Sequence, residues 1–185
     1  MSVLNEILAF NHQFVENKEY EPFQTTKFPD KGLVIVSCMD TRLTELLPSA
    51  MNIKNGDVKV IKSAGAVISH PFGSIMRSIL VAIYELKAEE VMVIGHYDCG
   101  MSNVNADGLL AKMKDRGIEE STFDTLKYSG LDLKKWVQGF ESVEDSVRNS
   151  VKLVKNHPLL PEDIKVHGLV IDPATGRLDL VESGE

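Results

Sequence analysis

Two short runs of consecutive apolar residues constrain the fold of this chain more than any other feature of the sequence. Residues 33–36 and 91–94 contain no polar side chain, and such runs are typical of strands that are buried on both faces of a sheet. Further strands are expected at residues 58–61, 166–171 and 178–181. Because segments with helical spacing lie between these strands, we expect an α/β fold in which helices flank a mostly parallel sheet.

Apolar residues at helical spacing predict the helices that separate the strands. Such spacing extends over the first 17 residues, and residues 143–154 carry a valine at nearly every turn. A third apolar stripe runs from residue 75 to residue 86, and Pro71 is expected at the start of that helix. Shorter helices are expected near residues 44–47 and, two or three of them, within residues 103–138.

The length and charge of the chain exclude several classes of protein. Its 185 residues correspond to a single domain, residues 1–185. A net charge of −7, without a basic block, leaves no face that could neutralise phosphates, so no nucleic-acid partner is expected. No apolar run approaches the ~20 residues needed to cross a bilayer, so no membrane partner is expected. The first residues lack the basic and apolar regions of a secretory signal, and we expect a cytoplasmic protein.

The only two cysteines of the sequence, Cys38 and Cys99, lie next to the ends of two predicted strands. Cys38 is followed by Asp40 and Arg42, and His96 precedes Cys99 by three positions. Because ligands bind at the carboxyl edge of a parallel sheet, these segments can converge if their strands are neighbours. Two thiolates and one imidazole form a Cys₂His set, which can hold catalytic zinc with a fourth position open. Asp40 is close enough in sequence to reach the metal, and Arg42 can pair with Asp40.

The residue types alone leave two other interpretations of these cysteines open. They could be buried thiols beside a histidine that has its own hydrogen-bond partners, which is common for lone cysteines in a cytosolic protein. They could also form a redox dithiol, if the strand ends bring them within disulfide range. Asp98, between His96 and Cys99, is expected to make loop hydrogen bonds rather than to bind a metal.

Five sequence segments resemble the β-class carbonic anhydrases. They are SCMDTRL at residues 37–43, KSAGA at 62–66, GHYDCGM at 95–101, VHGLVID at 166–172 and TGRL at 175–178. The last two are similar to the short, archaeal-type branch of that family. The resemblance extends from about residue 33 to about residue 180 and so covers most of the chain.

This resemblance implies a fold, a ligand set and an assembly. The sheet would have four parallel strands and one edge strand. One zinc ion per chain would be held by Cys38, His96 and Cys99. The resemblance also implies a homodimer or a tetramer, in which the N-terminal helix and arm, residues 1–30, pack on a partner subunit.

The resemblance further implies that the loop from Ser63 to Ala66 shapes the substrate pocket, so Ser63, Ala64, Gly65 and Ala66 are predicted pocket residues. The family commonly has asparagine at the position of Ser63, and glycine or asparagine at that of Ala66. These two departures leave the rate and the substrate preference open.

The implied activity is the reversible hydration of carbon dioxide to bicarbonate and a proton, with Asp40 and Arg42 as the catalytic dyad. Zinc would make a water molecule acidic enough to supply hydroxide near neutral pH, and Asp40, held by Arg42, would orient that nucleophile. The family also has closed sites in which this aspartate is the fourth zinc ligand, and we expect high pH to favour the open state. Two alternatives remain: a related zinc hydrolase that acts on carbon disulfide or carbonyl sulfide, and a non-enzymatic zinc-binding or redox-responsive protein.

Overall fold

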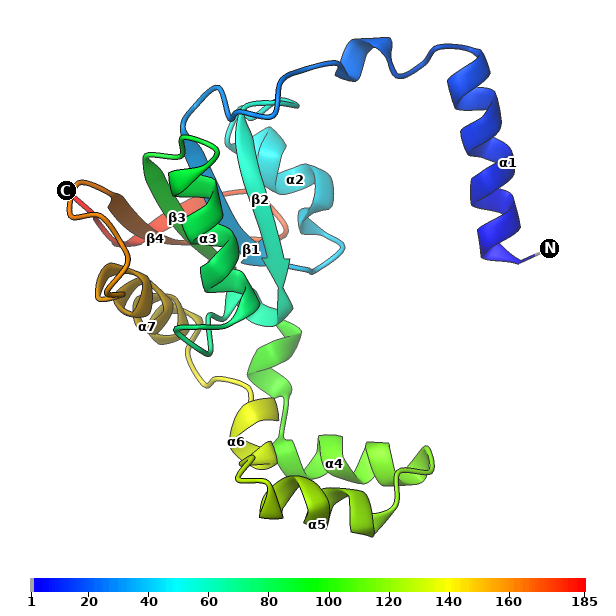
Figure 1. The fold of residues 1–185 in the computed structure, drawn as a ribbon, viewed down its shortest axis with the longest axis vertical. Helices are drawn as coiled ribbons and strands as arrows, with labels where there is room; N and C mark the ends of the chain where they lie inside the picture. Colours follow the sequence, from blue (N-terminus) through cyan, green and yellow to red (C-terminus); the bar gives the residue numbers. More distant parts are fainter. Residues whose placement is uncertain (1) are drawn as a thin grey trace.

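Five strands form one sheet in the order β2-β1-β3-β4-β5 (Figure 1). The computed structural model describes residues 2–185. β2, β1, β3 and β4 are mutually parallel, and β5 pairs with β4 in the antiparallel direction. The predicted α/β fold, with four parallel strands and one edge strand, is therefore confirmed. The strands are β1 (Leu33–Cys38), β2 (Val58–Ser63), β3 (Glu90–His96), β4 (Lys165–Ile171) and β5 (Leu178–Glu182).

Helices cover both faces of the sheet. On one face, α3 (Ser74–Tyr84) and α7 (Val143–Lys155) share a hydrophobic core with Val34 of β1. On the other face, α2 (Leu43–Ala50) packs against Ile35. Every residue of β1 is buried, which explains why residues 33–36 are continuously apolar instead of alternating.

Two parts of the chain project from this body (Figure 1). α1 (Val3–Glu16) stands apart from the sheet, and no residue of this helix is buried. Between β3 and α7, beyond the carboxyl ends of the parallel strands, three short helices form what we call the helical lobe. They are α4 (Ala106–Asp115), α5 (Glu120–Tyr128) and α6 (Leu133–Val137). Short 3₁₀ turns complete the structure at η1 (Glu21–Phe23), η2 (Ala64–Ala66) and η3 (Gly100–Asn103).

The helices lie where the sequence predicts them, with one difference at the start of α3. This helix does not begin at Pro71 but at Ser74, after Gly73 as its N-cap. The carbonyl of Pro71 accepts a hydrogen bond of 2.8 Å from His157 Nε2, so Pro71 belongs to the turn before the helix. Within residues 2–185 no helix is both long enough and apolar enough to cross a membrane.

Candidate functional site

Three potential metal ligands meet at the carboxyl edge of the sheet. Cys38 is the last residue of β1 and His96 is the last residue of β3, and these strands are parallel neighbours. Cys99 lies in the loop between β3 and η3. The donor atoms of the three residues lie within 4.8 Å of one another, and the two sulfur atoms are 3.9 Å apart. All three residues are buried, so the fold presents a preformed Cys–His–Cys group.

The hydrogen bonding of His96 fits that of a metal ligand. Its Nδ1 donates to the carbonyl of Tyr97 over 2.8 Å, because a carbonyl can only accept, and metal-binding histidines commonly use their second nitrogen in this way. Its Nε2 is buried and has no hydrogen-bond partner within residues 2–185. Buried polar atoms without a partner are rare, and a metal ion would satisfy this one. With two sulfurs beside one imidazole, the residues present fit zinc.

The turn after β2 supplies a hydrogen bond to one of the two sulfurs. The backbone N–H of Gly65 donates to Cys38 Sγ over 3.3 Å. Burial raises the pKa of Cys38, but the neighbouring His96 imidazole and backbone N–H groups outweigh burial and lower the pKa to about 7. Burial raises the pKa of Cys99 to about 11. Cys38 is therefore the sulfur that its surroundings most favour as a thiolate, which is the form that binds metals.

Asp40 and Arg42 form a bidentate ion pair beside the Cys–His–Cys group. Arg42 Nε donates to Asp40 Oδ1 over 3.0 Å, and Arg42 Nη2 donates to Asp40 Oδ2 over 2.9 Å. The Arg42 side chain, followed by its backbone N–H, lowers the pKa of Asp40 to about 2. Asp40 Oδ2 lies 3.7 Å from His96 Nε2, so an ionised carboxylate adjoins the atom that would bind the metal.

Asp98 belongs to the same network, and the hydrogen bonds expected of this loop residue go to Arg42 on another loop. Arg42 Nη1 donates to Asp98 Oδ2, and Arg42 Nη2 donates to the Asp98 carbonyl, each over 2.9 Å. The partner is thus on the loop after β1, 56 residues away in sequence. The available signal was an aspartate between two residues of one ligand set, but the sequence gives no sign of which side chain it contacts.

The predicted pocket loop lies next to the ligand group. Ser63 ends β2, and Ala64–Ala66 form η2. Gly65 and Ala66 are buried and have φ angles of +69° and +57°. The hydrogen bond from Gly65 to Cys38 ties this turn to the end of β1. The role of these four residues in substrate binding stays a prediction.

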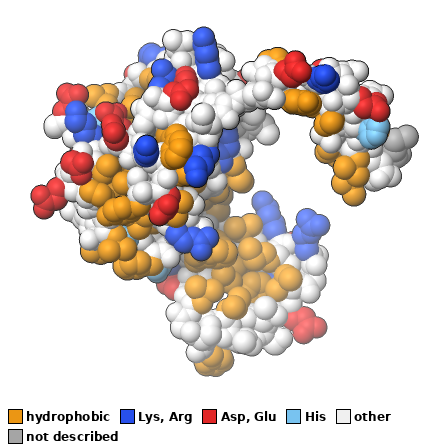
Figure 2. Space-filling model, turned by 45° about the horizontal axis from the view of Figure 1, so that its top comes forward, with side chains coloured by type: hydrophobic (Ala, Val, Ile, Leu, Met, Phe, Trp, Pro, Cys, Tyr) orange, Lys and Arg blue, Asp and Glu red, His pale blue; other side chains and the backbone are white. Residues whose placement is uncertain are grey.

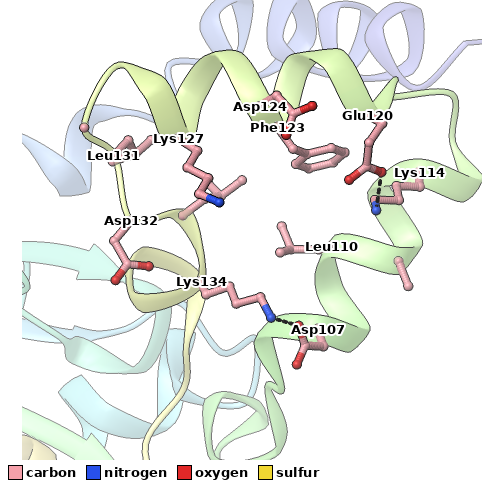
Figure 3. Close-up of a pocket in the computed structure, with 13 residues that line it drawn as sticks. Asp107, Leu110, Lys114, Glu120, Phe123, Asp124, Lys127, Leu131, Asp132 and Lys134 are labelled. Carbon is pink, nitrogen blue, oxygen red and sulfur yellow. Dashed lines mark ion pairs between the residues drawn. The ribbon is translucent and has the colours of Figure 1, made fainter.

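A cavity of about 840 Å³ lies elsewhere, between the three helices of the helical lobe (Figure 3). Leu110, Phe123 and Leu131 line it together with charged residues, among them Lys127. None of the residues of the Cys–His–Cys group or of the ion-pair network lines this cavity. The size of a cavity therefore does not locate the chemistry in this protein, whereas the cluster of ligand atoms does.

Comparison with known proteins finds relatives of this chain among the carbonic anhydrases. Residues 33–178 match the family described as "Carbonic anhydrase". The chain is 63% identical over 184 residues to "Putative carbonic anhydrase YtiB" of Bacillus subtilis (strain 168), covering 100% of this chain and 98% of the relative. It is 29% identical over 159 residues to a "Carbon disulfide hydrolase" of Acidithiobacillus thiooxidans, covering 80% and 76%. Among solved structures, β-carbonic anhydrase isoform I of Trichomonas vaginalis superimposes with a TM-score of 0.91 at 38% identity, covering 100% of both chains.

Proposed function

Because this chain belongs to the β-carbonic anhydrase family, we propose that it catalyses the reversible hydration of carbon dioxide to bicarbonate and a proton. One zinc ion per chain would be held by Cys38, His96 and Cys99. The observation that carries this proposal is the buried Cys–His–Cys group with the Asp40–Arg42 pair directly beside it. A protein that only stores a metal or responds to oxidation has no need of that ion pair.

The residues around the ligands have separate tasks in this reaction. Zinc supplies a Lewis acid that makes water acidic near neutral pH. Asp40 stays ionised because Arg42 holds both of its oxygens, so its carboxylate accepts a hydrogen bond from the attacking water and orients it toward the carbon of the substrate. Asp40 Oδ2 lies 3.7 Å from His96 Nε2, so Asp40 can also serve as the fourth ligand in a closed state, once it leaves Arg42.

The substrate would enter beside the turn formed by Ser63, Ala64, Gly65 and Ala66. Carbon dioxide and carbon disulfide are both small, linear and apolar, so this loop would decide between them. A carbon disulfide hydrolase is among the relatives of this chain, at 29% identity. Hydrolysis of carbon disulfide or carbonyl sulfide is therefore the second candidate activity.

Stopped-flow measurement of carbon dioxide hydration by the zinc-loaded protein tests the main proposal. We expect Asp40→Asn to keep one zinc per chain but to lower hydration by roughly 10- to 100-fold, the usual cost of losing an outer partner of a metal site. Asp145→Asn is the matched control, because it breaks an Asp–Arg pair with Arg148 on the surface of α7, away from the site. Wild-type protein that hydrates no carbon dioxide but consumes carbon disulfide would overturn the proposal in favour of the second activity.

We further propose a homodimer, on the basis of an apolar stripe that α1 exposes to solvent. Val3, Ile7 and Phe10 follow helical spacing and are 70%, 60% and 65% exposed. Exposed apolar patches of this kind usually mark interaction surfaces. α1 carries Glu6 and Glu16 but no lysine or arginine, so its partner surface should be apolar and at least partly basic.

The helical lobe offers an apolar surface whose lining carries charges of both signs, four acidic residues and three lysines. Leu110 and Phe123 point into its cavity, and Lys127 lies at the same opening (Figure 3). Figure 2 shows hydrophobic side chains around the hollow between the lobe and α1. Because α1 lies far from the lobe of its own chain (Figure 1), the occupant would be α1 of a second copy. The exchange is reciprocal, as a two-fold interface requires, and it would place the arm of residues 1–30 on the partner.

The mass of the protein in solution, measured by light scattering, tests this arrangement. We expect Ile7→Asp combined with Phe10→Asp to yield monomers at concentrations where the wild type is a dimer. Leu159→Asp is the control, because Leu159 is 55% exposed and lies outside α1 and the lobe. Unchanged mass in the α1 variant would contradict the proposed contact, and a wild-type tetramer would require a second interface.

We also propose that the protein works in the cytoplasm. Cys38 and Cys99 are free thiols whose sulfurs lie 3.9 Å apart. A reducing compartment keeps such a pair available as ligands, whereas an oxidising one favours a disulfide. Recovery of the protein with periplasmic or secreted material would argue against this location.

A further inference from the structure

Asp98 makes two contacts that neither zinc ligation nor the Asp40–Arg42 pair requires. It lies between His96 and Cys99, in the loop that would supply two of the three zinc ligands. Its side chain is 79% exposed, yet its carboxylate and its carbonyl both accept hydrogen bonds from Arg42. A freely solvated aspartate has no reason to hold this arrangement, so the two contacts suggest a task at the site.

The guanidinium of Arg42 is held on both sides. Of the five N–H groups that arginine offers, two donate to Asp40 and two donate to Asp98. If the bonds to Asp98 were absent, the guanidinium of Arg42, whose side chain is 42% exposed, would be held only by Asp40, and Asp40 would be held by that guanidinium and by the backbone N–H of Arg42. The contacts to Asp98 hold the guanidinium along a second edge, and a planar group bound along two edges cannot rotate.

The backbone conformation of Asp98 makes it suited to this contact. Its φ angle is +52°, a left-handed conformation that aspartate, asparagine and glycine adopt more readily than other residues. In this conformation the carbonyl and the carboxylate both reach the same guanidinium. The position therefore requires tolerance of positive φ and a side-chain acceptor, and aspartate supplies both.

We propose that Asp98 is a positioning residue, which anchors Arg42 to the His96–Cys99 loop and thereby fixes the orientation of Asp40. This inference rests on the proposed function, because orientation of Asp40 matters only if Asp40 acts on the attacking water. It also gives Arg42 a second role. Arg42 then connects the loop that carries Cys38 to the loop that carries His96 and Cys99, so the bond to Asp98 ties the ligand-bearing segments together.

The variants Asp98→Gly and Asp98→Asn distinguish the contribution of the side-chain acceptor from that of the backbone conformation. Both replacements tolerate positive φ, but only asparagine keeps an oxygen for Arg42 Nη1. For Asp98→Gly we expect kcat for carbon dioxide hydration to fall roughly tenfold with little change in KM, the lower end of the usual range because the pair is exposed. Asp98→Asn should restore most of the rate. Lys87→Gly is the control for a glycine placed at positive φ, since Lys87 has a φ of +62° and lies before β3, at the opposite edge of the sheet.

The second measurement is the rate at which zinc passes from the protein to a chromogenic chelator. If Asp98 ties the two loops together, Asp98→Gly should release zinc several-fold faster than the wild type and Asp98→Asn should not. In an Arg42→Lys background, a single ammonium cannot contact both aspartates. Asp98→Gly should therefore change neither the hydration rate nor the rate of zinc release any further.

The two measurements distinguish failure of this inference from failure of the proposed function. A wild type that hydrates carbon dioxide, together with an Asp98→Gly variant that matches it in kcat and in zinc release, would overturn the positioning role. Equal losses in Asp98→Gly and Asp98→Asn would also overturn it, because the acceptor would then be irrelevant. A wild type without hydration activity, but with zinc release accelerated only in Asp98→Gly, would leave the anchor in place and reject the proposed function.

Discussion

Gly65 is the residue at which one added methyl group should most directly disturb the ligand group. Its φ angle is +69°, and its N–H donates to Cys38 Sγ. A Cβ atom built on Gly65 would lie 2.8 Å from Phe140 Cε1 and 3.0 Å from Met101 Cγ. Gly65→Ala therefore combines an unfavourable backbone conformation with a steric conflict, at the turn that is hydrogen-bonded to Cys38.

The size of the effect follows from three contributions to the free energy of unfolding. A residue with a Cβ atom loses about 1–2 kcal/mol in the left-handed conformation. Forcing a methyl group into a packed region costs about 1–3 kcal/mol. Replacing glycine restricts the unfolded chain and returns about 0.4–1 kcal/mol. We therefore expect Gly65→Ala to destabilise the protein by about 3 kcal/mol, and to lower its Tm by about 6–12 °C for a domain of this length.

Urea unfolding at one protein concentration, with and without zinc, measures this loss. Ala66→Gly is the matched control in the same turn, because Ala66 already has a φ of +57°. Glycine there relieves the strained conformation while loosening the unfolded chain, so the free energy of unfolding should stay within about 1 kcal/mol of the wild type. The reasoning is refuted if Gly65→Ala unfolds at the wild-type urea concentration, or if Ala66→Gly loses as much stability as Gly65→Ala.

Three further predictions concern the metal ligands and one turn. Cys38→Ser, His96→Ala and Cys99→Ser should each bind zinc far more weakly, and stoichiometric zinc in all three purified variants would disprove the ligand set. Without zinc, Cys38 and Cys99 should be oxidised faster by mild peroxide than in the zinc-loaded protein; equal rates of thiol loss would speak against ligation by both. Backbone N–H groups lower the pKa of Asp172 below its ordinary 3.8, so its ionised form stabilises the fold above that pH and the benefit disappears as the pH falls. Asp172→Asn should accordingly lower the urea midpoint at pH 7 more than at about pH 3, whereas a constant difference would exclude the carboxylate as the cause.

The sequence was sufficient for the strands and for the meeting of Cys38, His96 and Cys99 at their carboxyl ends. β1 and β3 were predictable because a strand covered on both faces has a continuous apolar run at its centre, residues 33–36 and 91–94 here, and this pattern is local. The ligand group was predictable because both cysteines and His96 lie at strand ends, and parallel strands present those ends at one edge.

Contacts between distant segments were not predictable in the same way. The bond from Arg42 to Asp98 depends on how two loops meet, and an aspartate between two ligands looks like an ordinary loop residue. The start of α3 was misplaced for a similar reason, because the carbonyl of Pro71 is engaged by His157, 86 residues further along the chain. Helix-start rules consider only neighbours in sequence, so they could not include that bond.

The hydrophobic pattern does not reveal the order of the strands in the sheet, but the Cys–His–Cys group constrains that order. Adjacent strands are about 4.8 Å apart, and strands separated by one other are about twice as far apart. If β2 lay between β1 and β3, the backbones of Cys38 and His96 would be about 10 Å apart, and one metal ion could bind both only if the strand ends bent together. The observed order, with β1 beside β3 and β2 at the edge, brings the three donor atoms within 4.8 Å of one another. A hypothesis about shared ligation therefore predicts which strands are neighbours, and in this chain the chemistry of two short motifs carries information about topology that hydrophobic patterns do not.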